Sequence, residues 1–145
     1  MSRSPTPWPR PCMMLSKPGR PGNAHPVARY YFYNVPQEYG YRNPSHTQYE
    51  ETARIISRLN PQDSAVIIIS DAGAARGSNS DARFKATLRF IVRLKKATQK
   101  IVWLNPLPEY RWEKTTAWRI ARFVPMFSLT DQHPLQQAIN KLRGK

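Results

Sequence analysis

The chain has 145 residues and a formal net charge of +14, with 23 lysines and arginines against 9 acidic residues. This length fits one domain, no stretch is apolar enough for a transmembrane helix, and the N-terminus lacks the apolar core of a secretory signal. The single cysteine, Cys12, excludes an internal disulfide framework and is typical of a reducing compartment, so we expect a cytoplasmic protein. The basic balance makes nucleic acid a candidate partner.

Residues 1–28 differ in composition from the rest of the chain. They contain seven of the 14 prolines and show neither helical nor strand periodicity. Because proline lacks a backbone donor and interrupts both helices and ladders, this segment is predicted to be a disordered, basic arm. The folded domain is predicted over residues 29–145.

The remaining chain alternates predicted strands and helices. The aromatic run over 29–35 predicts a strand with its rings in the core, and Tyr41–Arg42 predicts a short edge strand. Thr47 and Glu50 have the spacing of a capping box, which predicts a helix over 47–59. Further along, the pattern predicts strands over 64–69, 101–104 and 126–129, and helices over 81–98, 115–123 and 131–142. This alternation is typical of a mostly parallel α/β sheet with helices on both faces.

The apolar run Ala65–Ile69 is followed at once by Ser70 and Asp71. Such a short β-branched run predicts a strand buried on both faces, in the middle of a parallel sheet. Ligands of open α/β sheets bind beyond the carboxyl ends of such strands, so Asp71 is the first candidate for a functional residue. The alternative is that its carboxylate accepts hydrogen bonds from amides of the following loop.

The predicted helix over 81–98 and the residues just after it carry basic side chains on one face. This face is either an ordinary solvated surface or a docking site for an acidic partner or a phosphate backbone. Its members are Lys85, Arg89, Arg93, Lys96 and Lys100.

Several catalytic and cofactor motifs are absent from the sequence. The loop over 73–77 lacks the Gly-Lys-Ser/Thr of a P-loop, and neither a GxGxxG fingerprint nor a Gly-x-Ser-x-Gly elbow occurs. The histidines are scattered, without zinc spacing, and the predicted folded part offers no evident acid–base pair. We therefore expect a protein that is not an enzyme.

Two motifs together resemble the von Willebrand factor A domains of the CoxE-like group. They are the segment Val66–Gly73, VIIISDAG, and the segment Ile101–Leu107, IVWLNPL, separated by a leucine-containing helix. The resemblance extends over about residues 29–143. It implies a doubly wound α/β fold, protein binding through the top of the sheet, and a bacterial, cytoplasmic accessory of a MoxR-type AAA+ ATPase.

The resemblance also implies a metal site. Asp71 matches the third ligand segment of the family, and Thr47, or alternatively Ser45, matches the second. The Asp-x-Ser-x-Ser of the first segment is absent. One carboxylate and one hydroxyl would hold Mg²⁺ weakly, so the metal site is expected to be incomplete and no cofactor is required. Helix capping is the alternative role of Thr47.

The family's first, central strand and its helix have no counterpart, because residues 1–28 occupy their place. The sequence therefore predicts a truncated domain that acts as a protein-interaction module. The alternatives are a basic nucleic-acid-binding protein that uses the Lys85–Lys100 face and the N-terminal arm, or a non-functional truncated product.

Overall fold

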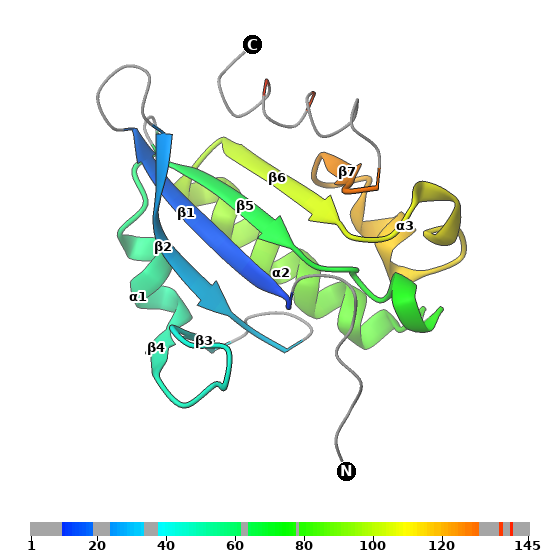
Figure 1. Cartoon of the computed structure of the whole chain (residues 1–145), viewed down its shortest axis with the longest axis horizontal. Coiled ribbons are helices and arrows are strands. Elements are labelled where there is room, and N and C mark those ends of the chain that lie inside the picture. The colour runs from blue at the N-terminus through cyan, green and yellow to red at the C-terminus, as the bar shows by residue number, and fades with distance from the viewer. Residues whose placement is uncertain are drawn as a thin grey trace.

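The computed structural model describes residues 10–18, 24–33, 38–61, 64–77 and 79–130, together with Gln137 and Asn140. The described strands form one sheet in the order β4-β3-β2-β1-β5-β6-β7 (Figure 1). These strands are β1 (Cys12–Pro18), β2 (Ala24–Tyr31), β3 (Tyr39–Tyr41), β4 (Tyr49–Glu51), β5 (Ala65–Ile69), β6 (Lys100–Asn105) and β7 (Met126–Ser128). The described helices are α1 (Thr52–Ser57), α2 (Asp81–Ala97) and α3 (Thr116–Ile120), with short 3₁₀ turns η1 (Ala74–Arg76) and η2 (Glu109–Arg111).

The sheet is mixed, with two halves of different pairing. β5, β6 and β7 run parallel to one another. β1 pairs antiparallel with β5, and the ladders from β1 through β4 are antiparallel as well. The predicted α/β class is confirmed, whereas the predicted mostly parallel sheet is found only in the half that contains β5, β6 and β7.

β1 lies in the middle of the sheet, between β2 and β5, where Cys12 pairs with Ile69. β1 is antiparallel to β5, so it is not the parallel first strand whose absence the sequence predicted. Disorder was also expected over 1–28, whereas residues 12–18 and 24–28 lie in strands. The reason is the apolar run over 12–15. Met13 is buried against the helices and Cys12 is buried on the other face, so pairing here removes apolar surface from water.

Proline enters β2 where the ladder is already irregular. The β1–β2 register shifts between Leu15 and Ser16, and Pro26 pairs with Ser16 next to this bulge. Over the described residues, β2 pairs with β3 only through Tyr31 and Tyr41, so the missing amide of Pro26 interrupts no second ladder. The strand therefore starts earlier than the expected 29–35.

One face of the sheet is packed against helices. α1 and α2 lie behind the sheet in Figure 1, and α3 contacts α2. Ser80 caps α2 by accepting a hydrogen bond from the Arg83 amide, and Asp81 in the first turn complements the helix dipole. The buried residues of α2 are Thr87, Phe90, Ile91 and Leu94. The three apolar ones belong to the same core cluster as Val66, Ile68, Ile101 and Trp103 of the sheet. The expected coverage of both faces by helices is not found among the described elements.

β4 replaces the first turns of the helix expected over 47–59, because its central residue is the hub of an ion cluster. The Glu50 carboxylate is 6% exposed and accepts a hydrogen bond from the Tyr30 hydroxyl at 3.1 Å. Arg42 bonds the same oxygen at 3.0 Å, and Arg58 pairs with the other oxygen. Burial raises the pKa of Glu50, but these three partners outweigh it and hold that pKa below its ordinary value.

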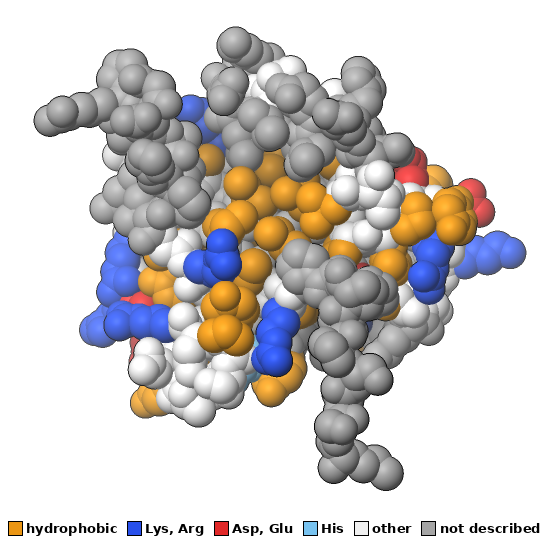
Figure 2. Space-filling view, in the orientation of Figure 1, with side chains coloured by type: hydrophobic (Ala, Val, Ile, Leu, Met, Phe, Trp, Pro, Cys, Tyr) orange, Lys and Arg blue, Asp and Glu red, His pale blue; other side chains and the backbone are white. Residues whose placement is uncertain are grey.

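The opposite face of the sheet is also apolar. Strand alternation and register place Cys12, Met14, Ile67, Ile69, Val102 and Leu104 on it. Figure 2 views this face and shows hydrophobic side chains gathered over β1, β5 and β6, with basic side chains among them. Ile67 and Ile69 are only partly buried.

The remaining expectations concern the C-terminal part of the chain. The strands and helices expected over 64–69, 81–98, 101–104, 115–123 and 126–129 are confirmed, with small shifts of their ends. The helix expected over 131–142 lies outside the described residues, apart from Gln137 and Asn140, which are helical. Among the described helices, none has the length and apolar character needed to cross a membrane.

Candidate functional site

Asp71 lies just beyond the carboxyl end of β5, as the sequence predicted. Its Oδ2 accepts a hydrogen bond from the Ala75 amide at 2.9 Å, and its backbone carbonyl accepts one from the Ala74 amide at 3.0 Å. The alternative role foreseen for this residue, acceptance of loop amides, is therefore present in the structure. The carboxylate closes the tight turn that leads from β5 into η1.

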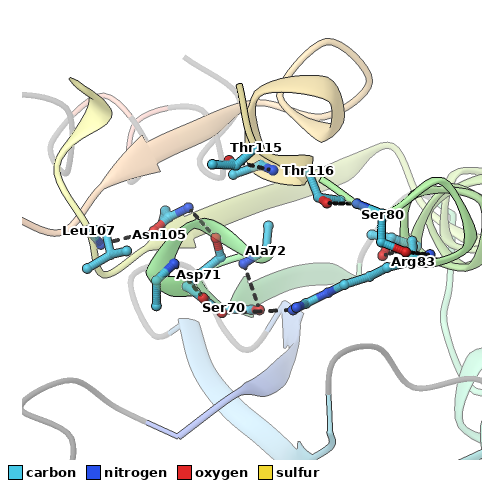
Figure 3. Close-up of polar contacts among 12 residues, drawn as sticks. Ser70, Asp71, Ala72, Ser80, Arg83, Asn105, Leu107, Thr115 and Thr116 are labelled. Carbon is cyan, nitrogen blue, oxygen red and sulfur yellow. Dashed lines mark hydrogen bonds and ion pairs between the residues drawn. The ribbon is translucent and has the colours of Figure 1, made fainter. Parts of the chain in front are cut away.

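Two residues of β6 hold the same turn from the neighbouring strand. The Trp103 indole donates to the Ser70 carbonyl at 2.7 Å, and Asn105 Nδ2 donates to the Asp71 carbonyl at 3.0 Å. Asn105 Oδ1 accepts from the Leu107 amide at 2.9 Å, so one fully buried side chain joins the loops that follow β5 and β6. Figure 3 shows Asn105 pointing at Asp71 from this side.

Arg83 reaches the turn from the first part of α2 (Figure 3). Its guanidinium lies 3.9 Å from Asp71 Oδ1, and the two side chains are only 18% and 17% exposed. A positive group on the chain itself therefore stands next to the carboxylate oxygen that the Ala75 amide does not bond. This contact reduces the net negative charge that would attract a cation.

α3 completes the carboxyl edge of the parallel strands. Thr115 caps α3 by accepting from the Ala117 amide at 3.2 Å. Thr116 Oγ1 accepts from the Ser80 amide at 3.3 Å, which joins the start of α3 to the start of α2. Gly73, with φ of 93°, lies so close that an added Cβ would meet Thr116 Cβ at 3.3 Å.

We expect Gly73→Ala to lower the free energy of unfolding by about 2 kcal/mol, because alanine here is strained in its backbone and crowded by Thr116. Gly77 is the matched control, since its φ is also positive at 62° but an added Cβ meets nothing within 4 Å. Gly77→Ala should cost about 1 kcal/mol or less. Urea denaturation of both variants measures the difference, and equal losses would contradict close packing at Gly73.

Thr47, the other predicted metal ligand, lies elsewhere. It belongs to the turn between β3 and β4, where its hydroxyl contacts Asn43 Nδ2 at 2.5 Å. β3, β2 and β1 separate β4 from β5 in the sheet, so the structure does not bring Thr47 and Asp71 together. Ser45, the alternative, is in the same turn and also contacts Asn43. Thr47 does not cap a helix either, because the N-cap of α1 is Glu51.

The donor set at Asp71 does not fit a divalent metal. Magnesium prefers several hard oxygen ligands with net negative charge, and here one carboxylate already binds an amide and lies next to a guanidinium. The described residues contain no group of three or more His, Cys, Asp or Glu side chains placed to hold an ion. Asp71 therefore lies at the end of β5, as expected for the third ligand segment, but its carboxylate already accepts a hydrogen bond from its own loop.

The edge also presents exposed aromatic residues that sequence patterns did not single out. Tyr110 of η2 is 77% exposed and Trp118 of α3 is 41% exposed. Arg111 Nη2 donates to the Ala75 carbonyl at 3.5 Å, so η2 lies beside η1. The available signal was an aromatic and charged segment, PEYRW, that follows a predicted strand without helical or strand periodicity.

The basic face expected on the helix over 81–98 is only partly formed. Lys85, Arg89 and Lys96 are exposed, whereas Arg93 and Lys100 are partly buried. The buried side of α2 is formed by Thr87, Phe90, Ile91 and Leu94, whereas Val92 is 43% exposed. This surface has the character of an ordinary solvated helix face.

Comparisons with known proteins add no constraint on this site. No protein-family model, curated protein or solved structure matches the chain.

Proposed function

We propose that the chain is a protein-interaction module whose binding edge is formed by the loops after β5 and β6. The observation that carries this proposal is the exposure of Tyr110 and Trp118 beside loops that are held together by hydrogen bonds of the buried Asn105 side chain. Tyrosine, tryptophan and arginine are the residues most often found at the energetic centres of protein interfaces. Rigid loops lose little entropy on binding, which favours recognition.

A binding role is proposed over a catalytic one because the polar side chains at this edge are already engaged in holding the loops together. The Asp71 carboxylate bonds Ala75, the Asn105 amide bonds Asp71 and Leu107, and the Thr116 hydroxyl bonds Ser80. A general acid or base needs a group that is free to exchange a proton with a substrate. The edge is therefore better suited to presenting a surface than to chemistry.

The finer proposal is a cytoplasmic module of CoxE-like von Willebrand factor A type, accessory to a MoxR-type AAA+ ATPase. Its support is the parallel half, β5–β6–β7, with Asp71 at the carboxyl end of β5 and the Trp-Leu-Asn-Pro segment at the end of β6. The antiparallel β1 and β2 depart from a doubly wound sheet. In this proposal the interaction does not depend on a metal, because Arg83 already faces the carboxylate.

The proposal is tested by biolayer interferometry of the purified full chain against a purified MoxR-type AAA+ ATPase. We expect binding that a Tyr110→Ala, Trp118→Ala double variant weakens at least tenfold, since each residue contributes about 1–2 kcal/mol or more at an interface centre. Tyr33→Ala, the same truncation at an exposed tyrosine on another part of the protein, should have no effect. Failure to bind the ATPase would reject this partner. A loss of affinity for Tyr33→Ala equal to that of the double variant would reject the proposed edge as the binding site.

The absence of metal dependence is measured separately on the chain alone. Millimolar Mg²⁺ should shift the melting temperature by less than about 1 °C, because a ligand that does not bind the folded state cannot stabilise it. Asp71→Asn should show the same response to Mg²⁺. A stabilisation of several degrees that Asp71→Asn abolishes would show that the carboxylate does hold a metal ion.

A further inference from the structure

A cluster of aromatic rings covers the sheet face around the β3–β4 turn. The imidazole of His46 stacks on the ring of Tyr41, with centroids 4.4 Å apart and planes 8° from parallel. Tyr33 meets the same imidazole at 4.1 Å and is itself 73% exposed. These rings come from two segments, the chain just after β2 and the β3–β4 hairpin. The sequence had predicted Tyr33 to be a core residue, and its exposure is a correction.

The same surface continues onto β2. Tyr31 is the register partner of Tyr41, and partners in an antiparallel ladder point to the same side of the sheet. Tyr30 packs into the core on the helix side, so Tyr31 and Arg29 belong to the opposite face. Arg29 is exposed and its guanidinium reaches Met14 Sδ at 3.5 Å on β1.

Two exposed arginines, Arg29 and Arg10, lie near the rings. Arg10 donates to the Pro44 carbonyl at 2.9 Å, which fixes its exposed guanidinium beside the turn that carries His46. Glu50 points into the ion cluster with Arg42 and Arg58 and contributes no free negative charge here. In Figure 2 the basic side chains lie among the hydrophobic ones, and the acidic side chains in view lie mainly toward the margins of this face.

His46 is suited to stacking as a neutral ring. Burial and the nearby Arg10 lower the pKa of its imidazole, so the ring is uncharged at pH 7. Its backbone has a φ of 58°, which is unusual for a residue other than glycine. The β3–β4 turn therefore holds the backbone of His46 in an unfavourable conformation that places its imidazole against Tyr41.

We propose that the surface formed by Arg10, Arg29, Tyr31, Tyr33, Tyr41 and His46 binds single-stranded nucleic acid, with bases stacked on the rings and phosphates contacted by the arginines. The exposed ring of Tyr33, beside the partly buried rings of Tyr31, Tyr41 and His46 and near two arginines, offers a stacking surface for unpaired bases and contacts for a phosphate backbone. The net charge of +14 favours a polyanionic occupant over a neutral or basic one. Duplex is disfavoured because its bases are already stacked on one another. This site is distinct from the edge that carries Tyr110.

The experiment is fluorescence anisotropy of labelled oligo(dT) and oligo(U) of about 20 nucleotides with the purified full chain. We expect binding that weakens steeply between about 50 and about 200 mM salt. Tyr33→Ala should weaken it about tenfold, whereas Tyr33→Phe keeps the ring and should retain the affinity. Tyr110→Ala removes a tyrosine of similar exposure elsewhere and should leave the affinity unchanged. Because Tyr33 is exposed, its variants should melt like the wild type.

The charge component is tested with a second pair of variants. Arg29→Gln should weaken binding and reduce the salt slope by about 1, whereas Lys85→Gln on α2 should do neither. Binding of both oligo(dT) and oligo(U) supports the proposal even if one is preferred, because unpaired bases and phosphates are common to the two and they differ only in the sugar 2′-hydroxyl and the base methyl group. The proposal is overturned by tighter binding to duplex, by equal effects of Tyr33→Ala and Tyr110→Ala, by a larger loss for Lys85→Gln, or by binding of polyglutamate as tight as that of the oligonucleotides.

Discussion

Asn105→Leu is expected to lower the free energy of unfolding by about 3 kcal/mol. The leucine removes the donor to the Asp71 carbonyl and the acceptor of the Leu107 amide, in a site with no exposed surface. A buried amide left without a partner costs about 1–3 kcal/mol, and the apolar leucine cannot replace either bond. Urea denaturation measures the loss. Amide hydrogen exchange at Leu107 should accelerate as well, because that amide would lose its acceptor.

The matched control for this variant is Asn79→Leu. Asn79 is exposed, and its side chain accepts one bond from Arg119 at 3.3 Å. Its replacement should change stability by no more than about 0.5 kcal/mol, as is usual for surface positions. If the two substitutions had similar effects, Asn105 would not be the link between the loops after β5 and β6. The protein-interaction proposal would then lose its rigid edge.

Glu50→Gln is expected to destabilise the protein by about 2 kcal/mol at pH 7. Glutamine fits the same space and can still bond the Tyr30 hydroxyl, but it loses the ionic contacts with Arg42 and Arg58. The loss should stay below the roughly 3–5 kcal/mol of a wholly buried pair, because both arginines are about half exposed and remain hydrated. Thermal or urea denaturation gives the value.

The pH dependence of this loss has a definite sign. The pKa of Glu50 in the folded protein lies below its ordinary value of 4.5, so its stabilisation is fully present above that value. The stabilisation disappears as the pH falls through the folded-state pKa, and the difference between wild type and Glu50→Gln should shrink in acid. Glu51→Gln, at the exposed neighbouring position, should be nearly neutral at pH 7. A difference that grows toward acid would contradict an ionised Glu50.

Sequence patterns located the elements whose signals are local. The run over 65–69 is apolar on both faces, and α2 begins at a serine cap followed by an acidic first turn. The position of Asp71 at the end of β5 was predicted from a local signal as well, because a polar residue that directly follows a buried apolar run marks the end of the strand. What the pattern left open was its partner, because Arg83 becomes a neighbour only when α2 folds back along the sheet.

The failures concern residues whose environment is set by distant parts of the chain. Thr47 and Glu50 match a capping box, but Glu50 meets Tyr30, 20 residues before it, and Arg58, at the C-cap of α1. Those contacts favour a strand at 49–51 over a helix. The proline content over 1–28 likewise predicted disorder. The sequence around Met13 does not show that β5 has an edge with which this segment can pair.

The central position of β1 has a consequence for how the protein is made. β1 is synthesised well before β5, yet its pairing with β5 requires Ile69 to be available for Cys12. At translation rates of about 5–20 residues per second, one edge of this apolar strand stays open for roughly 3–10 s after β1 has emerged. Among the described strands, β2 is the other partner of β1, and it pairs with the opposite edge. Binding of the nascent chain by chaperones should therefore be strongest while the residues between β2 and β5 are being added.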